Sequence, residues 1–182
     1  MKKWIFVSLG VLFSFYSSFT QQRLTVEKAR IQFASNAELE VIKASSDQVQ
    51  GLIEPSTNKF AFSVRIISFK GFNSELQRVH FNEKYLESER FPTASFSGKI
   101  IEELDLTKDG TYEVRAKGEL DIHGVKQTRI IKSSLTVNGA KVFITSKFNL
   151  ALSDHDITVP KIIGQKIATQ IELIFTATMV LK

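Results

Sequence analysis

Apolar and polar residues alternate with a period of two through most of the chain. Because successive side chains of a β-strand point to opposite faces, this alternation predicts strands that are buried on one side. The pattern is clearest at 112–122, where every second position is charged. It also predicts strands at 29–33, 39–44, 49–53, 59–67, 94–100, 131–137, 142–150 and 167–181.

Short loops separate the predicted strands. Asp109-Gly110 and Asn138-Gly139 indicate hairpin turns, because both dipeptides tolerate the positive φ angles that tight turns require. Helical periodicity occurs only at 74–89, where it predicts one or two helical turns with Asn82 as an N-cap. Many antiparallel strands joined by hairpins favour an all-β fold, either a sandwich or a closed barrel.

The first twenty residues follow a different pattern. Lys2 and Lys3 precede an uncharged, mostly apolar run at 4–15, and small or polar residues follow it. This order is typical of a secretory signal peptide, and the run is shorter than the roughly 20 residues that span a membrane. We therefore expect cleavage after Thr20, which would leave residues 21–182 as one exported domain, periplasmic or secreted, with no stable membrane span. An uncleaved N-terminal anchor is the alternative.

Composition and charge exclude several classes of function. The chain has 182 residues, no Cys, three His and a formal charge of +5. Two Lys leave with the signal peptide and no acidic residue does, so the charge falls to +3, which is too small an excess to indicate a nucleic-acid partner. Without Cys there are no disulfides, thiolate nucleophiles or Cys-type zinc sites.

The sequence also lacks the motifs that carry catalysis or metal binding. It contains no G-x-S-x-G, no H-E-x-x-H and no Gly-rich phosphate loop. His80, His123 and His155 lack the close spacing of metal ligands, although a weak surface ion site at His155 is an alternative. The acidic residues at 102–105 indicate a solvated turn rather than a catalytic carboxylate pair. We therefore expect no enzyme, no metal and no cofactor.

Two segments of the sequence resemble the YceI-like family. The first is 79–96, VHFNEKYLESERFPTASF, where a His and a short acidic helix precede an aromatic-Pro-Thr-x-x-Phe strand opening. The second is 118–126, GELDIHGVK, which is similar to the family's G-x-L-x-I-H-G-V strand and turn. The hairpin at 51–68 also resembles the family. The chain departs from it at 127–129, where members usually carry Pro-Val, and at 149–156.

The resemblance implies a lipocalin-like antiparallel β-barrel of about eight strands, with a short helical segment near 75–89. It also implies an exported, non-enzymatic protein that holds a long apolar lipid, of polyisoprenoid or quinone type, inside the barrel. The aromatic residues and the inward faces of the predicted strands then supply the candidate ligand-binding residues. These are Phe60, Phe62, Val64, Phe72, Phe91, Phe96, Leu120, Ile144, Phe148, Leu173 and Phe175.

Several alternatives stay open at this point. A barrel filled by its own side chains would act through its surface, as an interaction or stress-response protein. An enzyme acting on a lipid would need a polar pair inside the barrel, for which Ser133 and Ser146 are the candidates. An outer-membrane barrel is disfavoured, because residues 21–182 contain no Trp and only two Tyr to form the aromatic girdles at the membrane interfaces.

If the lipid ends in a phosphate, a basic group at the mouth would come from Lys70, Arg78, Lys161 or Lys166. The sequence does not decide which lipid is bound or whether the protein forms a homodimer.

Overall fold

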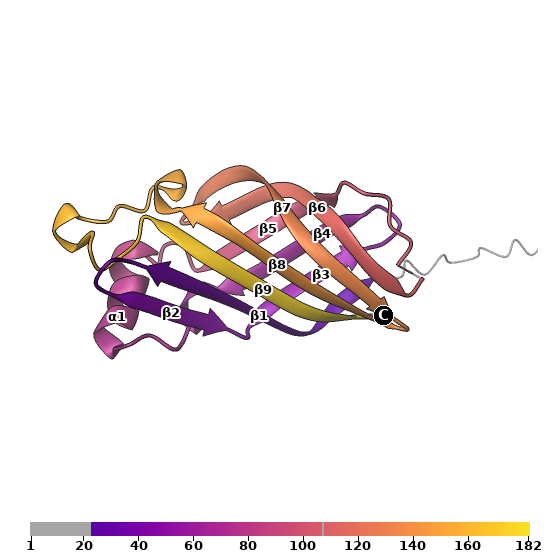
Figure 1. The fold of residues 1–182 in the computed structure, drawn as a ribbon, viewed down its shortest axis with the longest axis horizontal. Helices are drawn as coiled ribbons and strands as arrows, with labels where there is room; N and C mark the ends of the chain where they lie inside the picture. The colour runs from indigo at the N-terminus through magenta and orange to yellow at the C-terminus, as the bar shows by residue number, and fades with distance from the viewer. Residues whose placement is uncertain (1–22, 107) are drawn as a thin grey trace, which may run out of the picture.

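Within residues 23–106 and 108–182, which the computed structural model describes, nine antiparallel strands are hydrogen-bonded side by side (Figure 1). β1 also pairs with β9, and this pairing closes the sheet into a barrel. The predicted signal peptide at 1–20 lies outside the described residues. The strands are β1 (Leu24–Asn36), β2 (Val41–Ser46), β3 (Val49–Glu54), β4 (Lys59–Arg65), β5 (Thr93–Ile100), β6 (Gly110–Ile122), β7 (Val125–Asn138), β8 (Lys141–Ala151) and β9 (Gln170–Leu181).

β2 and β3 together occupy one position in the barrel. Ser46 pairs with Ile31 and Ile53 pairs with Leu24, so both short strands follow β1 in the same antiparallel register. The barrel therefore has eight positions, which confirms the predicted antiparallel barrel. Of these two short strands, only β3 pairs with β4. After β4 the chain leaves the sheet as a helical turn, η1 (Ile66–Ser68), so β4 does not extend alongside β2.

A short helix follows η1, as the periodicity at 74–89 predicts. α1 (Glu75–His80) continues into a wider helical turn, η2 (Phe81–Tyr85), at the left end of the barrel in Figure 1. Ser74 is the N-cap, because its hydroxyl accepts a hydrogen bond from the Gln77 backbone N–H at 3.2 Å. The prediction that Asn82 caps the helix was wrong, since Asn82 lies inside η2 and its side chain donates to the Arg78 carbonyl.

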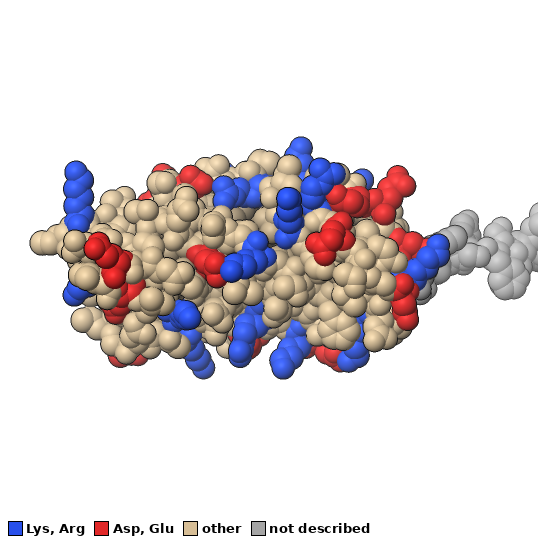
Figure 2. All heavy atoms as spheres, in the orientation of Figure 1, with Lys and Arg blue, Asp and Glu red and all other residues tan. Residues whose placement is uncertain are grey.

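The two faces of the sheet differ as the alternation predicts. On β6, Val114, Leu120 and Ile122 are buried toward the inside, whereas Arg115 and Lys117 are exposed. Figure 2 shows Lys, Arg, Asp and Glu side chains spread over the outside of the strands on this face. Most apolar side chains of the sheet are therefore gathered inside the barrel, although a few, such as Ile130 and Phe143, are exposed on its outside.

The ends of the barrel are built differently. β5 ends at Ile100 and β6 begins at Gly110, so the expected tight turn at Asp109-Gly110 is instead a longer loop. Leu104 and Leu106 of this loop are partly buried against the core and cover this end of the barrel. At the other end lie α1, η2 and two further turns, η3 (Leu152–His155) and η4 (Lys161–Ile163). No helix within the described residues is long and apolar enough to cross a membrane.

Candidate functional site

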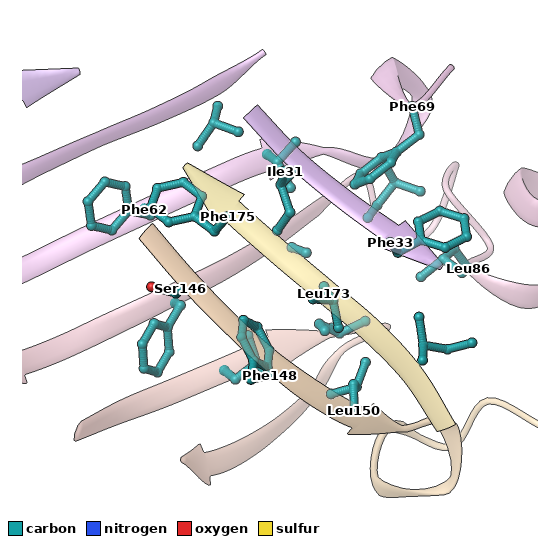
Figure 3. Close-up of a pocket in the computed structure, with 18 of the residues that line it drawn as sticks. Ile31, Phe33, Phe62, Phe69, Leu86, Ser146, Phe148, Leu150, Leu173 and Phe175 are labelled. Carbon is teal, nitrogen blue, oxygen red and sulfur yellow. The ribbon is translucent and has the colours of Figure 1, made fainter. Parts of the chain in front are cut away.

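The barrel is hollow. A cavity of about 390 Å³ lies inside it, within the range of about 300–1,000 Å³ that is usual for small-molecule sites. Phe62, Phe96 and Phe175 point inward yet are only partly buried, because their rings border this space. Figure 3 shows Phe62 and Phe175 facing each other and Phe148 farther along the same wall. The alternation of inward and outward positions along each strand, its parity, could not distinguish a hollow barrel from a filled one.

Most of the predicted ligand-binding residues border this cavity. Those that line it are Phe60, Phe62, Val64, Phe72, Phe96, Leu120, Ile144, Phe148, Leu173 and Phe175. Phe91 does not line it. Its ring lies 4.8 Å from the imidazole of His123, between ring centres, and the Arg90 guanidinium stands 4.8 Å over it. Parity could not place Phe91, because it precedes β5 in a loop. The binding role of these residues remains a prediction.

Sequence reasoning missed a second group of aromatic residues at the helical end of the cavity. Phe33 of β1 stacks on Phe81 of η2, with 5.4 Å between ring centres. Phe69 lies 5.7 Å from both rings. Phe33 lies in the segment 29–33 that was predicted as a strand, but it was not among the aromatic residues chosen as ligand-binding candidates. Phe69 and Phe81 were missed because they lie outside the strands.

The cavity reaches the surface at the end that carries α1, η2 and η4. Polar groups border it there: the carboxylate of Glu40 accepts a hydrogen bond from the Gln77 amide at 2.5 Å, and His80 and Tyr85 complete the rim. Among the basic residues expected at a mouth, Lys166 lines the cavity. Lys70, Arg78 and Lys161 are not part of its lining, and Arg78 pairs with Glu75 instead. One cationic side chain is thus available at the rim within the described residues.

His123 and His155 connect the turn between β6 and β7 to neighbouring segments through hydrogen bonds. His123 and Gly124 have φ angles of 54° and 74° and form the turn between β6 and β7. His123 Nδ1 donates to the carbonyl of His155 at 3.1 Å, and its Nε2 lies 3.2 Å from a carboxylate oxygen of Glu87. His155 is 0% exposed and its Nδ1 donates to the Val125 carbonyl, so the surface ion site considered for it is wrong. Across the described ranges, no group of three His, Asp or Glu side chains gathers as metal ligands would.

Burial raises the pKa of the Tyr85 phenol above its ordinary value of 10.0, because the ionised form would lose water. The hydroxyl at the rim is therefore protonated at neutral pH. The folded state holds this proton more tightly than the unfolded state, so its stabilising contribution is intact below pH 10 and is lost as the pH rises through the raised pKa.

This shift gives a spectroscopic prediction. We expect the ultraviolet titration of the protein, minus that of the Tyr85→Phe variant, to show phenolate absorption with its midpoint above pH 10, the ordinary pKa of tyrosine. A difference spectrum with its midpoint at or below that value would contradict the burial of Tyr85 at the rim.

Comparison with known proteins places this geometry among solved folds. The YceI-like domain model matches residues 18–179. A polyisoprenoid binding domain from Saccharophagus degradans, implicated in plant cell wall breakdown, has a TM-score of 0.72 at 12% identity, covering 89% of this chain and 99% of its own. BcnA of Burkholderia cenocepacia has a TM-score of 0.69 at 13% identity, covering 82% and 95%. The YceI protein of Campylobacter jejuni has a TM-score of 0.59 at 13% identity, covering 76% and 84%. At identities of 12–13%, the similarity to these solved structures establishes the fold alone. No curated protein matches the sequence.

Proposed function

Because the chain belongs to the YceI-like family, we propose that it is a non-enzymatic carrier that holds a long apolar lipid inside its barrel. The observation that carries the proposal is the cavity of about 390 Å³ with its apolar lining. The similar fold of a polyisoprenoid binding domain supports a ligand of isoprenoid or quinone type. A filled barrel that acts through its surface is less well supported, since such a barrel would leave no interior space.

The cavity is suited to such a lipid by its energetics. Each methylene group moved from water into an apolar site contributes about 0.8 kcal/mol. A chain of about ten carbons inside the barrel would therefore gain about 8 kcal/mol, on the scale of a micromolar dissociation constant before the entropy lost on association is subtracted. Burial of the chain therefore supplies a large favourable contribution, which offsets the entropy lost on association and grows with the length of chain enclosed.

The polar contacts inside the cavity favour a carrier over an enzyme. Ser133 and Ser146 face the interior, and their hydroxyl oxygens lie 2.6 Å apart. Among the residues that the structure describes, no His, Asp or Glu is hydrogen-bonded to either hydroxyl, and a nucleophilic serine needs such a group as a general base. The carboxylate of Glu40 is at the rim and already accepts a hydrogen bond from Gln77. We therefore assign this interior a binding role.

We also propose that the protein is exported, on the signal-peptide pattern of residues 1–20. A carrier in the periplasm or outside the cell would shield an apolar lipid from water while it moves away from a membrane.

Native mass spectrometry tests both parts of the proposal. The full chain is expressed in a bacterial host, and the protein is purified from the exported fraction without detergent. We expect the mass of residues 21–182, together with an adduct that yields a lipid on extraction. Absence of the protein from the exported fraction would overturn export, and a mass that includes the first twenty residues would overturn cleavage. A bare mass that stays unchanged after isoprenoid quinones and polyprenyl phosphates are offered would overturn lipid carriage.

A further inference from the structure

Two pairs of buried serines occur within the described residues, and their hydrogen bonding differs. In the first pair, the hydroxyl oxygens of Ser46 and Ser68 lie 2.6 Å apart. The Ser68 hydroxyl donates to the Arg65 carbonyl at 2.5 Å, and Ser46 accepts from the Gln48 N–H at 3.0 Å. Each hydroxyl proton of this pair thus has a protein acceptor. The pair does not line the cavity, and its role is structural.

The second pair, Ser133 and Ser146, is incomplete. The two residues face each other directly across β7 and β8, and their hydroxyl oxygens lie 2.6 Å apart. Two hydroxyls carry two protons, and only one proton can lie between the oxygens. The second proton has no acceptor among the described protein atoms. The pair therefore offers one hydrogen-bond donor that the protein itself does not use.

This unused donor points into the cavity. Ser133 and Ser146 both line it, although they are only 8% and 6% exposed. On the adjacent strands Ser133 pairs with Val114 and Ser146 with Phe175, so its neighbours there are apolar. Figure 3 shows the Ser146 oxygen within a wall of apolar side chains. A buried donor without an acceptor is unfavourable, and a ligand atom that accepts its proton would be favoured at this place.

The donor lies well inside the barrel. Leu150 is near the rim on the same strand, and Ser146 is four residues deeper. At about 3.3 Å per residue of strand, the two positions are about 13 Å apart along β8. A ligand group that reaches the pair must therefore enter the barrel rather than stay at the mouth. Its polar atom should be neutral, because the paired neighbours Val114 and Phe175 supply no positive charge.

We propose that the Ser133–Ser146 pair binds a neutral, hydrogen-bond-accepting oxygen of the ligand, such as a ketone or quinone carbonyl. This inference rests on the proposed lipid carriage and narrows it. The ligand class becomes an apolar chain with an oxygen that inserts into the barrel, instead of a pure hydrocarbon or a lipid with a phosphate at the same place. The free hydroxyl proton is donated to that oxygen, while the other proton stays between the two serines.

The test compares two ligands that differ in one oxygen. The probes are geranylgeranylacetone, an isoprenoid ketone, and the hydrocarbon in which its carbonyl is replaced by CH₂. They are bound to the folded protein and to the Ser133→Ala/Ser146→Ala variant. The matched control is Ser134→Ala/Thr145→Ala, which changes the next pair along the same two strands, outside the cavity lining.

We expect the unmodified protein to bind the ketone about three- to tenfold more tightly than the hydrocarbon, the factor that one neutral hydrogen bond gives. The Ser133→Ala/Ser146→Ala variant should lose this preference and keep its affinity for the hydrocarbon. The control variant should behave like the unmodified protein. The infrared C=O stretch of the bound ketone should lie at a lower frequency in the unmodified protein than in the double alanine variant.

The outcomes separate this inference from the proposed function. If both probes bind but the double alanine variant keeps the preference for the ketone, the inference is overturned. Equal binding of both probes by the unmodified protein overturns it as well. If neither probe binds the unmodified protein, lipid carriage fails and this inference fails with it. Should the double alanine variant not fold, Ser133→Ala/Ser146→Cys removes both hydroxyls while leaving less empty space, and the same comparisons decide.

Discussion

Replacement of Phe148 by Asp is expected to abolish lipid retention by the barrel. Phe148 projects from β8 into the cavity, where its ring forms part of the apolar wall (Figure 3). The substitution removes aromatic contact area and places a carboxylate against the ligand, and a buried charge without a partner is strongly unfavourable. We expect ligand affinity to fall by about a hundredfold or more, since each 1.4 kcal/mol corresponds to about a factor of ten.

Two variants on the same strand control this result. Phe143 is 42% exposed and is not part of the cavity lining, so Phe143→Asp should retain its lipid. Phe148→Trp keeps an aromatic ring in the wall and supplies a fluorophore, because the described residues contain no Trp. Its emission should shift when a ligand binds. Retention of lipid by a correctly folded Phe148→Asp variant would count against this face as the binding wall.

Replacement of Gly118 by Ala is expected to destabilise the whole barrel. Gly98 and Gly118 face each other directly between β5 and β6. A Cβ atom on Gly118 would lie 2.2 Å from the Ser97 carbonyl oxygen, and one on Gly98 would lie 2.1 Å from that of Lys117. Both obstacles are backbone atoms held in the sheet, so relief requires that the two strands separate locally.

We expect the loss of folding free energy to reach about 3 kcal/mol, the upper range for overpacked sites. At about 2–4 °C per kcal/mol for a chain of this size, the melting temperature should fall by roughly 6–12 °C. Thermal unfolding followed by circular dichroism measures this shift. The control is Gly164→Ala, since Gly164 has a φ of −60° and a Cβ there would lie no closer than 3.3 Å to its neighbours. Equal melting temperatures for Gly118→Ala and the unmodified protein would show that the strands can adjust.

The parts of the cavity that could be predicted are those that depend on strand parity. Phe62, Phe96 and Phe148 were assigned to inward faces because alternation with a period of two leaves one choice of face for each strand. The same parity placed Ser133 and Ser146 inside. Their contact, however, depends on the register between β7 and β8, and parity within one strand does not determine that register.

The rest of the site depends on contacts between segments that are distant in sequence. Phe33 gains its place in the site by stacking on Phe81, a contact that strand alternation does not predict, and Phe81 was missed because η2 is not a strand. The burial of His155 follows from the docking of η3 against β7, which the polar residues beside it did not suggest. The volume of the interior depends on the curvature of all strands together, so no single segment could indicate it.

The closure of the barrel by its first and last strands has a consequence for how the chain folds. Leu24 pairs with Leu181, so nearly the entire described chain separates these partners. Such a high contact order places folding in the slow regime of about milliseconds to seconds, because chain entropy is lost before the closing contacts form. Until β9 docks, β1 and β8 both present unpaired edges that can associate with other chains. A chain shortened by its last strand is therefore expected to aggregate rather than to form a smaller barrel.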